Sequence, residues 1–291
     1  MSCKVMGIVN VTPDSFSDGG QFFKPEEAIR RAKNLIADGA DIIDLGGEST
    51  RPGATPIGWE EEWARIEPVL TSLASSVSRL KSSRISVDTY HPETAARAIA
   101  AGAHIINCVY AAPIPEMLKL LEGNDVELVM PYRLNGEAAS SQPDNNGEAA
   151  SSPLVKDGTS TFLTSDEDVA SPLLDRIYLD PMIGFGTTRE EDIELLRSIP
   201  KLAKKGRVLV GASRKRIVKK LVGEKSAVGK NVGGNVAIAV WAAMQGASVV
   251  RVHDVKETVR RSPHSRQKPR TPIRVKQRNI ASSLSSKRLN G

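Results

Sequence analysis

The chain has 291 residues, 40% of them hydrophobic, so it is long enough for one large α/β barrel or two medium domains. Its net charge of +6 invites a nucleic-acid interpretation, but the charge is unevenly placed. Residues 256–291 carry eleven Lys and Arg and one acid, whereas the other 255 residues carry 29 Lys and Arg and 33 acids. The part of the chain that can fold is therefore mildly acidic, which argues against a nucleic-acid partner.

Three features of the sequence indicate where in the cell the protein is located. No run of about 18 apolar residues indicates a membrane span. Residues 1–4 lead directly into a strand-like run, without the pattern of a signal or transit peptide. Cys3 and Cys108 form neither a disulfide framework nor a metal-ligand spacing, so we expect two buried thiols. These features predict a cytoplasmic protein.

Eight short runs, most of them apolar at both parities, alternate with helical patterns, as expected for strands that are buried on both faces. The strand-like runs are residues 5–11, 41–46, 84–88, 104–109, 126–130, 176–180, 207–211 and 248–253. The helical patterns are residues 26–37, 60–72, 92–101, 115–121, 189–202 and 232–244. Eight strand-then-helix units in this length predict a closed (β/α)8 TIM barrel, with a doubly wound open sheet as the structural alternative.

Two regions interrupt this alternation. Residues 133–175 are rich in Ser, Asn, Gly and Pro and contain the heptapeptide NGEAASS twice, which is typical of a disordered insertion. The insertion leaves only residues 166–174 for the fifth helix. We expect one barrel domain over residues 1–258 with a truncated eighth helix, followed by a basic, disordered tail over residues 259–291.

Polar residues follow the predicted strands at their carboxyl ends, where the active sites of such barrels lie. They are Asn10, Asp44, Asp88, Asn107, Asp180, Lys215, Arg251 and His253. Taken singly, each could be a helix cap, a turn residue or a solvated strand end. Because buried polar groups need partners, the full ring predicts a polar ligand in the mouth of the barrel.

The chemistry of the ring indicates the kind of ligand. One set of side chains offers donors and acceptors that suit a flat, nitrogen-rich heterocycle: Asp44, Asp88, Asn107, Asp180 and Lys215. A second set suits an anion such as a phosphate: Thr50, Arg51, Arg251 and His253. Glycine-rich loops at residues 11–20 and 46–53 could fold over the mouth and exclude water.

Several segments resemble the signatures of the dihydropteroate synthase family. Residues 6–20 (MGIVNVTPDSFSDGG) and 44–54 (DLGGESTRPGA) are similar to its first two motifs, which are long and specific. Similar later blocks follow in order: SVDT at 86–89, HIIN at 104–107, LDPMIGFG at 179–186, GASRK at 211–215 and RVHDV at 251–255. The resemblance covers about residues 5–132 and 176–258.

The resemblance implies a transferase of folate synthesis. Such an enzyme condenses 6-hydroxymethyl-7,8-dihydropterin pyrophosphate with p-aminobenzoate and releases 7,8-dihydropteroate and pyrophosphate. The resemblance further implies that Mg²⁺ is the cofactor, that sulfonamides compete with p-aminobenzoate and that the protein is a homodimer.

The family's residue roles can be carried over where the motifs match. The pterin ring would be held by Asp88, Asn107, Asp180 and Lys215. Asn10 would ligate Mg²⁺, and the pyrophosphate would be bound by Arg51, Arg251 and His253. The p-aminobenzoate pocket would be lined by Thr50, Pro52, Phe185 and Lys215. The expected catalytic residues are Asp88, Asp44, Lys215 and Arg251, because they surround the charges that form as pyrophosphate leaves.

The chain departs from the family pattern at several positions. Cys108 stands where Asp is usual, Pro131 and Tyr132 follow Met130 where a Met-His pair is usual, Thr187 replaces a Lys, and Arg216 stands where Ser is frequent. These departures keep open the alternative of an inactive pterin-binding paralogue. A pterin-dependent methyltransferase that serves a corrinoid partner is a second alternative, because it uses a similar barrel, but it does not need the phosphate-binding cations Arg51, Arg251 and His253 that this chain keeps. A third alternative is a binder of nucleic acid or anionic surfaces that acts through the basic tail.

Overall fold

The computed structural model describes residues 3–12, 24–49, 54–80, 83–132, 173–222 and 231–261. In this part of the chain, eight parallel strands close into a barrel in which strands pair in chain order and the last pairs with the first. The strands are β1 (Lys4–Asn10), β2 (Ile42–Gly46), β3 (Arg84–Asp88), β4 (Ile105–Asn107), β5 (Glu127–Pro131), β6 (Ile177–Asp180), β7 (Arg207–Val210) and β8 (Val249–Val252). The predicted TIM barrel is confirmed, and the open sheet was wrong.

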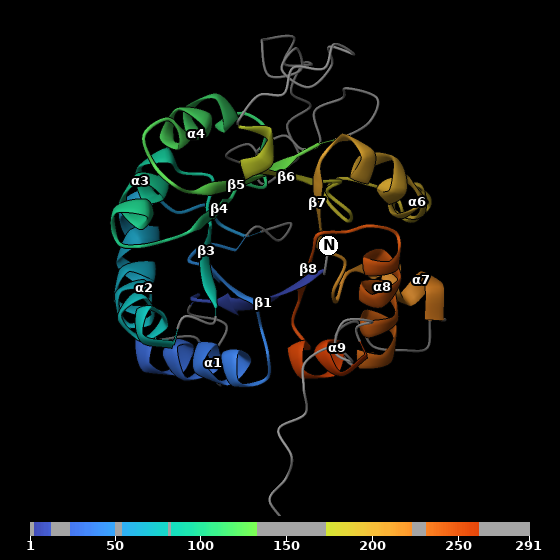
Figure 1. Ribbon diagram of the computed structural model, residues 1–291, viewed down its shortest axis with the longest axis horizontal. Helices are drawn as coiled ribbons and strands as arrows, with labels where there is room; N and C mark the ends of the chain where they lie inside the picture. The colour runs from blue at the N-terminus through green and yellow to red at the C-terminus, as the bar shows by residue number, and fades with distance from the viewer. Residues whose placement is uncertain are drawn as a thin grey trace, which may run out of the picture.

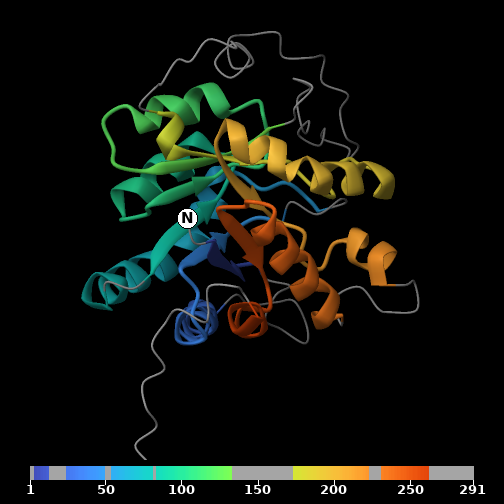
Figure 2. The same cartoon turned by 45° about the vertical axis from the view of Figure 1, so that its right-hand side comes forward.

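Helices surround the barrel (Figure 1). They are α1 (Pro25–Ala37), α2 (Trp59–Leu80), α3 (Pro92–Ala100), α4 (Ile114–Leu121), α6 (Arg189–Lys205), α7 (Arg216–Val222), α8 (Val232–Met244) and α9 (Val255–Arg261). Helix α9 lies beside α1 in both views, so the last unit closes the ring against the first (Figures 1 and 2). None of the helices in the described ranges is long and apolar enough to cross a membrane.

The two interrupting regions can be compared with the structure only at their edges. The predicted insertion, with both heptapeptides, lies outside the described residues up to residue 172, and the tail does so from residue 262. Where the end of the fifth helix was expected, a short 3-10 helix, η2 (Leu174–Arg176), leads into β6. The helix after β8, α9, has seven residues in the described part of the chain.

The interior of the barrel is built in three layers, because alternate residues of a strand point to the same side. The middle layer is apolar and almost fully buried: Met6, Ile42, Ile105, Val129, Tyr178, Leu209 and Val249. Residues two positions further along these strands, toward the carboxyl ends, also point into the barrel. Several of them form a polar layer: Asp44, Asn107, Asp180 and Arg251. The apolar layer thus forms the bottom of the candidate site.

A charged layer lies on the other side of the apolar layer, at the amino ends of the strands. Glu127 accepts hydrogen bonds from Arg207 Nη1 at 2.7 Å and from the Tyr178 hydroxyl at 3.3 Å. Arg84 also donates to Glu127. The guanidinium of Arg207 lies 3.8 Å from the centre of the Tyr178 ring. We call Arg84, Glu127 and Arg207 the floor of the barrel.

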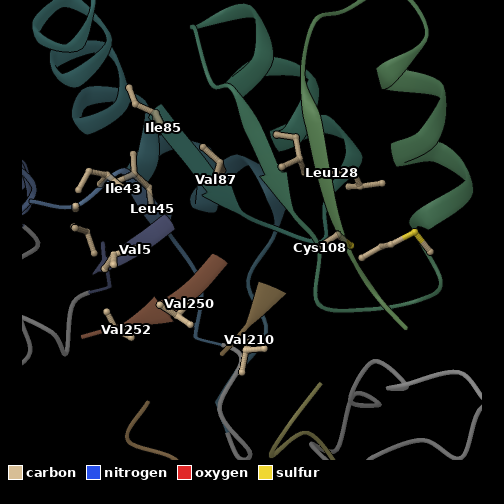
Figure 3. Packing of buried hydrophobic residues seen from close by; sticks show 14 of the residues in the cluster. Val5, Ile43, Leu45, Ile85, Val87, Cys108, Leu128, Val210, Val250 and Val252 are labelled. Carbon is tan, nitrogen blue, oxygen red and sulfur yellow. The ribbon is translucent and has the colours of Figure 1, made fainter. Parts of the chain in front are cut away.

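The apolar strand residues of the other parity, such as Val5, Ile43 and Ile85, point outward and belong to the main hydrophobic core, part of which Figure 3 shows. Gly7 allows α9 to approach β1 closely, since a Cβ there would lie 2.9 Å from Val255 Cγ2. Cys3 and Cys108 are buried free thiols, as predicted. Burial raises the pKa of the Cys108 thiol to about 12, so it is inert at neutral pH.

Candidate active site

Arg251 on β8 joins two carboxylates at the mouth of the barrel. Its Nε donates to Asp44 Oδ2 at 2.6 Å, and its Nη2 donates to Asp88 Oδ2 at 2.5 Å. The amide of Asn107 donates to the same Asp44 oxygen at 3.2 Å. Four residues predicted from different strands are therefore in one hydrogen-bonded cluster.

The cluster is electrostatically strained because it holds two carboxylates in a buried place. Burial and the neighbouring Asp44 outweigh the attraction of Arg251 and raise the pKa of Asp88 to about 7. Burial alone would lower the pKa of Arg251, but Asp44 and Asp88 together raise it, so the guanidinium stays charged. Asp88 can therefore change its charge near neutral pH while Arg251 cannot.

Several buried oxygens in this cluster have no hydrogen-bond partner among the described residues. They are Asp44 Oδ1, Asp88 Oδ1, Asn107 Oδ1 and, one layer below, Ser86 Oγ. A buried acceptor without a partner costs about 1–3 kcal/mol. The side of the mouth formed by β2, β3 and β4 is therefore suited to a ligand with several N–H donors.

Asp180 and Lys215 face the mouth from β6 and from the loop after β7. Asp180 Oδ1 accepts from the backbone N–H of Met182 at 2.8 Å, and burial raises the pKa of this carboxyl. Burial lowers the pKa of Lys215 to about 8, and the nearby Asp180 carboxylate opposes that change. The predicted pair therefore consists of an acceptor and a donor that titrate closer to neutrality than usual.

The turn after β6 fits around the Lys215 side chain. Lys215 Nζ donates to the Ile183 carbonyl at 2.6 Å and lies 4.3 Å from the centre of the Phe185 ring. Gly184 has φ +79°, and a Cβ there would lie 2.9 Å from Lys215 Cδ, so this position requires glycine. Phe185 also packs on an apolar cluster of Val109, Tyr110 and Met182. A polar edge and an apolar face thus lie side by side.

His253 follows Arg251 on the same side of β8, two residues further on. Its Nδ1 lies 3.1 Å from Ser213 Oγ, and its backbone N–H donates to the same oxygen at 3.3 Å. The Arg31 side chain donates to the His253 carbonyl at 3.0 Å. These contacts fix the imidazole at the end of the strand, beyond Arg251.

Asn10 ends β1 on the side of the mouth that faces Asp88. Both side chains face Gly46: a Cβ on that glycine would lie 3.9 Å from Asn10 Oδ1 and 4.0 Å from Asp88 Oδ2. Amide and carboxylate oxygens are the ligands that Mg²⁺ prefers. The described residues hold no group of three or more His, Cys, Asp or Glu that could bind a metal alone. Asn10 Oδ1 and Asp88 Oδ2 are thus two oxygens of the kind that Mg²⁺ takes as ligands.

Three predicted residues, Thr50, Arg51 and Pro52, lie outside the described residues. The loop that contains them is anchored at its described ends by Glu48, which the sequence analysis did not single out. Glu48 accepts from the Tyr90 hydroxyl at 2.7 Å and from the Ile57 N–H at 3.3 Å, and lies 3.2 Å from His91 Nε2. The glutamate ties the loop after β2 to the loop after β3.

Asp192 is a second residue that sequence reasoning missed. It is fully buried, and its Oδ1 accepts from the Gly184 N–H and from the Thr187 hydroxyl, each at 2.6 Å. A signal was present, because Asp192, Leu196 and Ile199 are spaced to lie on one helical face. Thr187, noted only as a departure from the family pattern, is a buried partner of this carboxylate.

The fold and the site define a TIM-barrel protein with a polar, ion-paired binding site at the carboxyl ends of its strands. The chain belongs to the family of pterin binding enzymes, whose family model matches residues 6–253.

Relatives of known activity extend over most of the chain. A dihydropteroate synthase from Staphylococcus haemolyticus is 36% identical over 261 residues, which cover 88% of this chain and 91% of that protein. The structure of Xanthomonas albilineans dihydropteroate synthase with 4-aminobenzoic acid is 34% identical, with a TM-score of 0.68 and coverage of 89% and 90%. The Anaplasma phagocytophilum enzyme with bound 6-hydroxymethylpterin-monophosphate is 29% identical, with a TM-score of 0.68 and coverage of 89% and 96%.

Proposed function

We propose that the protein is a dihydropteroate synthase, which condenses 6-hydroxymethyl-7,8-dihydropterin pyrophosphate with p-aminobenzoate to give 7,8-dihydropteroate and pyrophosphate. One observation carries the proposal: Arg251 is fixed between Asp44 and Asp88, directly beside buried oxygens that have no partner among the described residues. This places a permanent cation next to acceptors for a ring rich in N–H groups. A pterin that carries an anionic leaving group has both features.

The pterin ring would occupy the polar side of the mouth. Its amino and ring N–H groups would donate to the oxygens of Asp88, Asn107 and Asp180, and Lys215 would donate to its carbonyl edge. The p-aminobenzoate ring would lie against Phe185, near Lys215, in a pocket completed by Thr50 and Pro52. The Xanthomonas structure with 4-aminobenzoic acid and the Anaplasma structure with a pterin monophosphate support a site for each ligand in this family.

The leaving group would lie at the cationic end of the mouth. Arg251 and His253, with Arg51, would bind the pyrophosphate, and Asn10 would hold Mg²⁺ together with the phosphate oxygens. When bound, Mg²⁺ neutralises negative charge on the pyrophosphate. The guanidinium of Arg251 is already oriented by two carboxylates before the substrate arrives, so little reorganisation is needed.

The reaction requires little acid–base chemistry from the protein. As the bond between the pterin methylene and the pyrophosphate oxygen breaks, positive charge grows on the methylene, and the carboxylates of Asp44 and Asp88 would stabilise it. The neutral amine of p-aminobenzoate then forms the C–N bond and loses a proton to solvent. Positioning and electrostatics would supply most of the rate enhancement.

We also propose that the protein is a homodimer. Helix α8 exposes Trp241 and Met244, with 38% and 68% of their surface accessible. Residues three apart lie on the same side of a helix, so these two large apolar side chains form one exposed patch. Sedimentation equilibrium of the wild-type chain and of a Met244→Lys variant tests this; a wild-type monomer would reject it.

Pyrophosphate release by the purified protein tests the proposed activity. We expect release only when the pterin pyrophosphate, p-aminobenzoate and Mg²⁺ are all present, with loss of release in Asp88→Asn and Lys215→Ala. Glu194→Gln, at an exposed position of α6, is the matched control and should retain full activity. No release from folded protein that still binds a pterin would replace the synthase with an inactive pterin-binding paralogue.

A further inference from the structure

The peptide between Ile183 and Gly184 links two charged side chains. Its carbonyl accepts a hydrogen bond from Lys215 Nζ at 2.6 Å, and its N–H donates to Asp192 Oδ1 at 2.6 Å. The negative end of the peptide dipole thus faces the ammonium, and the positive end faces the carboxylate. Hydrogen bonds arranged in such a chain polarise one another and strengthen.

Helix α6 does not need Asp192 to begin. Its first turn is capped by Thr188, whose side chain accepts from the Glu191 N–H at 3.2 Å, while Glu191 Oε2 accepts from the Thr188 N–H at 2.6 Å. These two bonds form a complete capping box. The buried carboxylate is therefore an addition to an already satisfied helix start.

The hydrogen bonds that Asp192 accepts do not require a charged side chain. Both bonds that it accepts end on Oδ1, and its buried Oδ2 has no partner among the described residues. An asparagine amide oxygen could accept the same two bonds from Gly184 and Thr187. Burying an ionised group is costly unless a nearby opposite charge compensates it. Among the described residues, Lys215 is a cation on which the charge of Asp192 acts, and the Ile183–Gly184 peptide lies between the two.

We propose that Asp192 is a positioning residue for Lys215: through the Ile183–Gly184 peptide, its carboxylate fixes the lysine side chain in the mouth and keeps its ammonium charged. The catalytic consequence rests on the synthase activity proposed above, whereas the effect on the lysine does not. The charged groups around Lys215 are Asp180 from β6, Asp88 from β3, Arg251 from β8 and Asp192 from α6. Of these, Asp192 is the one that the proposed substrates would not contact.

The test measures the ionisation of Lys215 directly. Competitive acetylation with acetic anhydride at a series of pH values, read by mass spectrometry of the Lys215 peptide, reports when the amine becomes neutral. In Asp192→Asn we expect the labelling curve to move to lower pH by about one pH unit, a tenfold gain in reactivity at fixed pH below the midpoint. Glu194→Gln removes an exposed carboxylate from the same helix and should leave the curve unchanged.

Two further measurements separate the possible outcomes. If the synthase activity holds, the alkaline limb of its pH profile should move with the labelling curve; if the protein has no such activity, the labelling curve alone decides. An unchanged curve in folded Asp192→Asn overturns the proposal. If that variant does not fold, the double variant Asp192→Asn/Lys215→Met decides: recovered folding supports the coupling, and failure of both variants to fold opposes it.

Discussion

Arg251 Nε and Asp44 Oδ2 lie 2.6 Å apart although their strands, β8 and β2, are separated in the barrel by β1. The guanidinium therefore reaches across the mouth, and its other end donates to Asp88 on β3. A planar group with donors in fixed directions can bridge two carboxylates in this way, whereas a lysine ammonium on a flexible stem cannot hold the same geometry.

Arg251→Lys should therefore strongly impair the proposed reaction, although the substitution keeps the positive charge. We expect kcat/KM to fall about 100-fold or more, the magnitude typical of losing one oriented transition-state donor. Steady-state assays of pyrophosphate release measure it. Arg197→Lys, at an exposed ion pair of α6, is the control and should have no effect. A kcat/KM within twofold of wild type for Arg251→Lys would contradict the assigned role.

The pH dependence of kcat/KM should be bell-shaped. The pKa of Asp88 is raised to about 7, so its carboxylate is protonated below that value and gains its charge as pH rises. The pKa of Lys215 is lowered to about 8, so its ammonium is lost as pH rises further. We expect an optimum between these values, because the ionised acid and the charged amine are both required. A profile that is flat from pH 6 to pH 9 would reject both assignments.

The acid limb can be separated from the titration of the substrate's own phosphates. Calorimetric binding of a pterin that lacks phosphate should strengthen as pH rises through about 7 in the wild-type protein, following the Asp88 carboxylate. In Asp88→Asn the affinity should be weak and independent of pH across that range. A pH dependence that persists in the variant would show that another group is responsible.

Asn10→Ala should raise the Mg²⁺ concentration needed for half-maximal activity by about tenfold or more, since the substitution removes an oxygen ligand for the proposed ion. Titrating Mg²⁺ at saturating substrates measures the change. Asn34→Ala, which removes the same amide from the exposed face of α1, is the control. An unchanged requirement in Asn10→Ala would mean that the ion is held by the substrate phosphates alone.

Glu127→Gln should affect stability and leave chemistry intact. The substitution removes the negative charge between Arg84 and Arg207 in the floor, where the side chains are partly exposed. We expect the free energy of unfolding to fall by about 1–2 kcal/mol, since partial exposure reduces the value of each ion pair. Urea denaturation measures it, with exposed Glu122→Gln as the control. A large loss of kcat at a temperature where the variant is folded would be inconsistent with this separation.

The barrel and most of its ring could be predicted from the sequence because burial on both faces leaves continuous apolar runs. The predicted strands begin and end within two residues of the observed ones. The same parity argument places a polar residue two positions after an apolar one, as in Ile42 and Asp44 or Val249 and Arg251. The structure brings these residues together at the predicted end of the barrel.

The connections between strands were less predictable because their geometry depends on long-range packing. Helix α7 was not among the predicted helices although Ile217, Val218 and Leu221 are spaced to lie on one helical face, because seven residues are too few for such a pattern to stand out. Glu48 and its partners Tyr90 and His91 come from two different loops, and no spacing in the sequence brings them together. Asp192 carried a signal, but its neighbours Glu190 and Glu191 made the segment resemble an ordinary solvated helix start.

The apolar middle layer of the barrel has a consequence for how this molecule can evolve. This layer, which includes Met6, Ile105 and Leu209, separates the charged side chains of the floor from the polar side chains of the mouth. Charges in the floor can therefore be exchanged, lost or inverted under selection for thermal tolerance without altering ligand recognition above. Conversely, substitutions in the mouth can alter ligand binding while the opposite end of the barrel holds the fold. Substitutions at one end of the barrel can therefore accumulate without changing the function of the other end.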